Sequence, residues 1–175
     1  MAASLIVQLR SPAPFSMVLQ TASELLVRLL NLDAEVKLVY ELPPARRRLL
    51  LASTTAVDGN FPGAYIRLQG IEGSMVNFHV FNSPIPGEVD RLLLSCEASG
   101  RGPASVVLAA ALSAAAGNLM DGSIEDGGHH WLEKDECSPG ELIESLSLRE
   151  PPPDFKAAVE LVYRRMAIYQ RYPTH

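Results

Sequence analysis

One segment of the chain concentrates side chains that bind metal ions or exchange protons. Between residues 117 and 139 the sequence holds many carboxylates, two adjacent histidines and the chain's only tryptophan. Carboxylate and imidazole groups that lie close together can ligate a metal ion or act as a general acid and base. The candidate residues of this segment are Asp121, Glu125, Asp126, His129, His130, Trp131, Glu133, Asp135 and Glu136.

The spacing of these residues does not fit a metal site. Adjacent residues on a strand point to opposite faces, so His129 and His130 would not ligate one ion together. A calcium-binding loop that began at Asp121 would need glycine at its sixth position and glutamate at its twelfth. The sequence has Asp126 and Leu132 at those positions. We therefore predict no metal ion and no cofactor.

Other reactive side chains also lack a catalytic pattern. The sequence contains no G-x-S-x-G motif, and Cys96 lies in an apolar stretch that indicates a buried strand. His79 alternates with apolar residues, which is typical of a half-exposed position on a strand. We interpret the glycines on either side of Arg101 as a strand-to-helix turn and not as an anion site. We expect a protein without catalytic residues.

Length and composition indicate one soluble domain, residues 1–175. Hydrophobic residues make up 47% of the chain, and the net charge is -5. This charge argues against nucleic-acid binding, because phosphate contacts need clustered lysine and arginine. The apolar run over 104–116 is shorter than the roughly 20 residues that a membrane span requires. Two distant cysteines favour a reducing compartment, so we expect a cytoplasmic protein that does not bind a membrane.

The hydrophobic pattern predicts the order β-α-β-β-β-β-β-α-β-α-α. Helical spacing predicts long helices over 15–30 and 103–116, the second capped by Gly117. Strands are predicted over 4–10, 35–42, 46–54, 64–71, 74–81, 91–97, 121–126 and 129–132. We expect hairpins between the second and third and between the fourth and fifth of these strands, while 121–126 and 129–132 form either a strand pair or one interrupted strand. Ser138 and Asp154 start two C-terminal helices. This order predicts an α+β fold: a mainly antiparallel twisted sheet with two long helices packed on one face and additional C-terminal helices.

The candidate segment is strongly acidic. Between Asp121 and Glu144 the chain has eight of its twenty acidic residues and a single basic residue, Lys134. A surface with one sign of charge speeds association with a partner of opposite charge and selects for it. Trp131 lies in the middle of the segment, and tryptophan is prominent among the residues that dominate protein interfaces. We favour a recognition surface for a basic protein partner.

The same part of the chain resembles small bacterial immunity proteins of polymorphic or contact-delivered toxin systems. The resemblance covers about the last third of the chain. It consists of a small-residue helix end over 114–117, an acidic strand over 124–126, the run His129-His130-Trp131 and the helix start at 138–142. It implies an acidic α+β protein that binds one toxin domain, often a basic nuclease, and blocks it. The resemblance offers no catalytic residues to carry over.

Two other functions remain open. One is a small-ligand-binding or metal-binding enzyme with a pocket near Glu125, Asp126 and His129. The other is a structural subunit or a secretion-system adaptor that uses the exposed apolar face of a helix. A pocket lined by those three residues would favour the enzyme, and a homo-oligomer in solution would favour the subunit.

Overall fold

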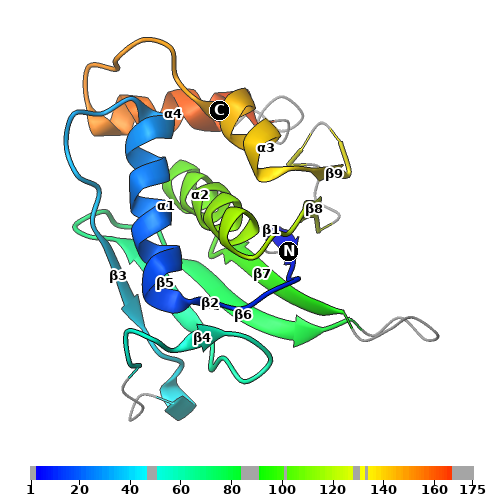
Figure 1. Ribbon diagram of the computed structural model, residues 1–175. Helices are drawn as coiled ribbons and strands as arrows, with labels where there is room; N and C mark the ends of the chain where they lie inside the picture. Colours follow the sequence, from blue (N-terminus) through cyan, green and yellow to red (C-terminus); the bar gives the residue numbers. More distant parts are fainter. Residues whose placement is uncertain are drawn as a thin grey trace.

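A seven-stranded antiparallel sheet forms the base of the molecule in the computed structural model (Figure 1). The structure describes residues 3–46, 51–83, 91–100, 102–127, 131–132 and 134–166. In spatial order the strands are β3 (Leu38–Glu41), β5 (Ala64–Leu68), β6 (Val76–Asn82), β7 (Leu92–Ala98), β1 (Ala3–Gln8), β8 (Ile124–Asp126) and β9 (Glu136–Cys137). The N-terminal strand β1 therefore lies inside the sheet, and β8 and β9 form one of its edges.

Two long helices pack on one face of this sheet, which confirms the predicted α+β fold. Helix α1 covers Phe15–Leu30, as its apolar spacing predicts, and ends at Asn31 in the left-handed conformation with φ 49°. Helix α2 covers Pro103–Leu119 and contacts β1, β7, α1, α3 and α4. Figure 1 shows α3 and α4 on the far side of α2 from the strands. Helix α2 is thus the centre of the core.

The composition of α2 follows from this central position. Residues 105–117 are all buried, although a surface helix would expose one face. The many alanines allow the sheet and three helices to approach the α2 backbone closely. The prediction that Gly117 caps α2 is wrong, because the helix continues to Leu119. A Cβ on Gly117 would lie 2.6 Å from Cγ of Pro139, so glycine is needed there for packing.

The predicted pairing of 35–42 with 46–54 is not found among the described residues. A short 3₁₀ helix over Pro44–Arg46 follows β3, and β3 pairs with β5 instead of with residues 46–54. The strand near that position is β4 (Ala56–Val57), which pairs with β2 (Ala13–Pro14) in a separate small sheet. Part of the predicted strand, residues 47–50, lies outside the described residues. The predicted hairpin of β5 and β6 is confirmed, with Gly73 at φ 70° in its turn.

Two C-terminal helices complete the fold. Helix α3 covers Pro139–Leu146, and its predicted capping box is present: Oγ of Ser138 accepts a hydrogen bond from the Glu141 amide, and the Glu141 carboxylate accepts one from the Ser138 amide. Helix α4 covers Phe155–Arg165 and is capped by Asp154. Their apolar sides close the core over α2. Within the described residues no helix is long and apolar enough to cross a membrane.

Candidate functional site

The acidic segment forms the β8–β9 edge of the sheet. Strand β8 pairs with β1 on one side and with β9 on the other. Both edges of β8 are thus occupied, and 131–132 are not a strand, so the described residues do not show the predicted pairing of 121–126 with 129–132, of which 129–130 lie outside the described residues. The true partner, β9, places Glu125 directly opposite Glu136. This pairing brings together two candidates that are eleven positions apart in the sequence.

Glu125 and Glu136 are a like-charged cross-strand pair. Residues directly opposite in antiparallel strands have Cβ atoms about 5 Å apart, and like charges there are destabilising. Among the described residues, no ion pair compensates either carboxylate, nor those of Asp121 and Asp135. We call these four residues the acidic edge. They carry negative charge that the described part of the molecule leaves without a cationic partner.

Lys134 is the one basic residue within the acidic segment, and it forms an ion pair with Glu141. Its ammonium lies 3.3 Å from Oε1 of Glu141. The hydrogen bonds from the Ser138 amide and hydroxyl, and then Lys134, lower the pKa of Glu141 to about 2. Glu141 therefore stays ionised, and Lys134 does not neutralise the acidic edge.

Two glycines fix the acidic segment against β1. A Cβ on Gly122 would lie 2.1 Å from the carbonyl oxygen of Gln8, a distance that real Cβ atoms essentially never show. A Cβ on Gly127 would lie 2.4 Å from Oγ of Ser4. Only glycine permits this approach of backbone to backbone. The position of the carboxylates between these glycines is therefore set by close packing and not by a loose loop.

Asp126 has a structural role that separates it from the acidic edge. Its carboxylate accepts a hydrogen bond of 3.0 Å from the Leu132 amide, and its own amide donates to the Asp135 carbonyl at 3.0 Å. It also lies opposite Leu5, whose side chain is buried, whereas Glu125 lies opposite Ile6. Neighbouring residues of a strand point to opposite faces, so Glu125 and Asp126 do not converge on one ligand. Asp126 thus links the end of β8 to Leu132 and Asp135.

Trp131 is buried, which corrects the expectation of a surface side chain. Only 1% of its surface is exposed. Its indole Nε1 has no hydrogen-bond partner among the described residues. The neighbouring candidates His129, His130 and Glu133 lie outside the described residues. Trp131 therefore contributes to the core and to the wall of a neighbouring hollow, not to an exposed patch.

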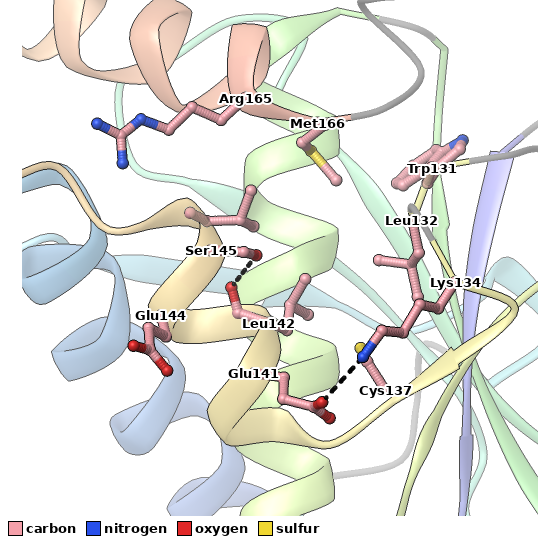
Figure 2. A pocket seen from close by; sticks show the side chains of 11 residues that line it. Trp131, Leu132, Lys134, Cys137, Glu141, Leu142, Glu144, Ser145, Arg165 and Met166 are labelled. Atoms are coloured by element: carbon pink, nitrogen blue, oxygen red, sulfur yellow. Dashed lines mark hydrogen bonds and ion pairs between the residues drawn. The ribbon is translucent and has the colours of Figure 1, made fainter.

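Two hollows adjoin the acidic edge. The first, which we call the apolar hollow, has a volume of about 400 Å³ and lies between α3, the end of α4 and the residues Trp131, Leu132, Lys134 and Cys137 (Figure 2). The second, which we call the acidic hollow, has a volume of about 520 Å³ and includes Asp121, Glu136 and Glu141 in its lining. Cys137 and Glu141 line both. The two hollows therefore share a wall.

The structure brings the sequence candidates together only in part. Asp121 and Glu136 line the acidic hollow, and Trp131 lines the apolar hollow. Asp135 is exposed beside them. Neither hollow is lined by Glu125 or Asp126, the described members of the expected enzyme pocket. Within the described residues no group of three histidine, cysteine, aspartate or glutamate side chains is placed to hold a metal ion.

Several lining residues were not identified from the sequence as site candidates. Glu141 could have been identified from the local sequence, because the capping box places its carboxylate at the start of α3 beside the acidic run. No local pattern indicates Arg10, since it reaches the acidic hollow only through the pairing of β1 with β8. Arg165 and Met166 line the apolar hollow from the end of α4, which the sequence does not place near Trp131.

Cys137 in the shared wall is predicted to react slowly with alkylating reagents. Burial is the main cause that raises its pKa from 9.0 to about 11, and the Glu141 carboxylate adds to it. At pH 8 the thiolate fraction is then about 100-fold lower than for an ordinary cysteine. Iodoacetamide labelling followed by mass spectrometry should give a rate for Cys137 that rises through pH 10 without a plateau.

Cys96 provides the internal control for this labelling. It is fully buried, and its pKa is raised to about 12 by burial. It should stay unlabelled in the folded protein, and both thiols should label at similar rates in denaturant. Rapid labelling of Cys137 at neutral pH would contradict the protonated thiol that we assign to the shared wall.

Comparisons of the chain with protein-family models, with curated proteins and with solved structures found no match. Any inference about function therefore rests on the geometry of the β8–β9 edge. That geometry offers uncompensated carboxylates on a rigid sheet edge and two adjoining hollows.

Proposed function

We propose that the protein is a non-enzymatic binding protein that holds a basic protein partner against its acidic edge. The observation that carries this proposal is the cross-strand pair Glu125 and Glu136. A folded protein gains nothing in stability from two carboxylates opposite each other. A lysine or arginine of a partner placed between them would convert the repulsion into two attractive interactions.

The charge distribution supports the same proposal. The four carboxylates of the acidic edge lie on β8, β9 and the adjoining turns, and Lys134 is paired with Glu141. A patch of one sign attracts an oppositely charged protein before contact and raises its association rate. The close contacts of Gly122 and Gly127 with β1 hold the backbone of β8, which carries Glu125.

We infer that the partner is a toxin domain with a basic surface and that the protein acts as its immunity protein in the cytoplasm. Two observations support this: the resemblance of the last third of the chain to such proteins, and the acidic edge that a basic domain would fit. The inhibitor would act by covering the basic surface on which a nuclease depends for its substrate. No catalytic group of this chain is required for such inhibition.

The test is a pull-down and a protection assay with the product of the neighbouring gene. We expect a complex of the two purified proteins, and growth of cells that produce both when the neighbouring product alone is toxic. Absence of a complex together with absence of protection would remove the immunity proposal.

The association rate of any such complex should fall as salt is added. Exposed charges are screened within about 10 Å at 0.1 M salt, so an acidic edge that attracts its partner loses reach between 0.02 and 0.3 M. Stopped-flow measurements should show an association rate that falls by about tenfold or more over this range. A rate that does not depend on salt would show that the acidic edge does not attract the partner.

A further inference from the structure

The apolar hollow has several apolar side chains in its lining. Its lining comprises the apolar side chains of Trp131, Leu132, Leu142, Leu146 and Met166, together with polar residues at its rim. Figure 2 shows Trp131 and Met166 toward one end of the hollow and Lys134 with Glu141 toward the other. The volume of about 400 Å³ lies in the range of ligand pockets.

The charges around the apolar hollow balance one another. Lys134 and Arg165 oppose Glu141 and Glu144 in its lining. Lys134 is paired with Glu141 at 3.3 Å, and Nη1 of Arg165 donates to the Ser147 carbonyl at 2.5 Å. Because these charges sum to zero, the hollow favours a neutral side chain over an ion.

The acidic hollow on the other side of the shared wall has the opposite character. Asp121, Glu136 and Glu141 supply three carboxylates, and Arg10 is the single cationic side chain in its lining. Cys137 stands between the two hollows with its thiol protonated. An apolar receptor and an anionic receptor therefore lie side by side, with Cys137 and Glu141 in the wall that they share.

We propose that the two hollows together recognise a short linear element of the partner, with one apolar side chain in the apolar hollow and a nearby lysine or arginine in the acidic hollow. This inference rests on the proposed function and adds the chemistry of the contact. An apolar anchor in a desolvated pocket beside a charged contact is the usual form of an interface hot spot. The charge complementarity of the acidic hollow selects a basic peptide segment rather than a neutral small molecule.

Selection of random 12-residue peptides displayed on phage, with the full chain immobilised, tests this inference. We expect enriched peptides in which leucine, phenylalanine or methionine lies within a few residues of lysine or arginine. Synthetic copies of these peptides should change the emission of Trp131, which lines the apolar hollow and is the chain's only tryptophan.

A variant that fills the apolar hollow provides the decisive comparison. Ser145 is an exposed residue of α3 that lines the hollow, so Ser145→Phe should place a ring in it without disturbing the core. We expect the affinity for the enriched peptides to fall at least tenfold. Ser145→Ala keeps the hollow open and should bind as the wild type does.

Ser16→Phe is the matched control. Ser16 and Ser145 are both exposed helical serines whose Oγ donates to a backbone carbonyl, that of Ser53 and that of Leu142 respectively. Ser16 lies in α1 and does not line either hollow. Ser16→Phe should leave peptide affinity unchanged. Circular dichroism of all three variants checks that each is folded.

The outcomes separate this inference from the proposed function. If the enriched peptides are basic but lack an apolar residue, and bind Ser145→Phe as tightly as the wild type, the recognition by two hollows is overturned. The proposal that the acidic edge binds a basic partner is then unaffected. If the enriched peptides are apolar and their affinity does not change with salt concentration, the apolar hollow binds a ligand but the basic partner is contradicted. Selection that enriches no sequence would overturn the linear element, while the folded partner in the pull-down still tests the proposed function.

Discussion

Replacing Gly122 with alanine should destabilise the protein by about 3 kcal/mol, the upper part of the range for overpacking a rigid site. The new Cβ would lie 2.1 Å from the Gln8 carbonyl oxygen and 2.9 Å from Cγ1 of Val7. Neither atom is the far end of a flexible side chain, so the backbone of β1 or of the acidic segment must move. Urea unfolding should show the loss, and the melting temperature should fall by about 10 °C.

Gly140→Ala is the matched control for this substitution. Gly140 lies in the first turn of α3, and its nearest neighbour to an added Cβ is Oγ of Ser138 at 3.9 Å. Alanine in a helix is favoured over glycine by about 0.5 to 1 kcal/mol, so this variant should be as stable as wild type or more stable. Equal destabilisation of the two variants would show that close packing against β1 does not fix the acidic segment.

Reversing both charges of the cross-strand pair should slow association with the basic partner by about 100-fold at low salt. The double variant Glu125→Lys with Glu136→Lys replaces two attractive carboxylates with two repulsive ammonium groups on the same strands. The pair remains like-charged, so the free energy of unfolding should change little. Stopped-flow association and urea unfolding measure the two effects separately.

The control for this variant carries the same change in net charge elsewhere. Glu72 and Glu150 are exposed and lie outside the acidic edge, in the β5–β6 turn and after α3. Glu72→Lys with Glu150→Lys should reduce the association rate by less than threefold. An equal loss in both double variants would mean that net charge governs binding and that the acidic edge has no special role.

A single reversal separates function from stability. Glu136→Lys places opposite charges across β8 and β9, which should stabilise the fold by about 0.5 kcal/mol while it weakens binding. Gains in stability that cost function are characteristic of residues kept for binding. Asp126 is unsuitable for this purpose, because its replacement would also remove the hydrogen bond that its carboxylate accepts from the Leu132 amide.

Local patterns in the sequence predicted the helices well. The apolar spacing of α1 gives its bounds, Phe15–Leu30, because burial of one face repeats every 3.6 residues. The capping box at Ser138 and Glu141 is also local, since both hydrogen bonds form within four residues. The predicted end of α2 is wrong because a glycine after an apolar helix is typical of a C-terminal cap. Gly117 instead lies within α2, and its lack of a side chain makes room for Pro139.

Strand pairing could not be predicted in the same way, since it depends on contacts between distant segments. The short link between residues 42 and 46 suggested a hairpin, but β3 instead pairs with β5. The pairing of Glu125 with Glu136 was missed for the same reason. Residue type suggested that Trp131 belongs to an interface, but it is buried as part of the hydrophobic core, which residue type alone could not show.

Hydrogen–deuterium exchange of the complex against the separate protein tests the central claim most directly. If the acidic edge and its hollows hold the partner, amides of residues 121–127 and 134–141 should gain protection on binding, and those of the β5–β6 hairpin should not. Protection confined to α1 or to β3, β5 and β6, with residues 121–127 and 134–141 unchanged, would contradict the claim that the β8–β9 edge is the partner-binding site.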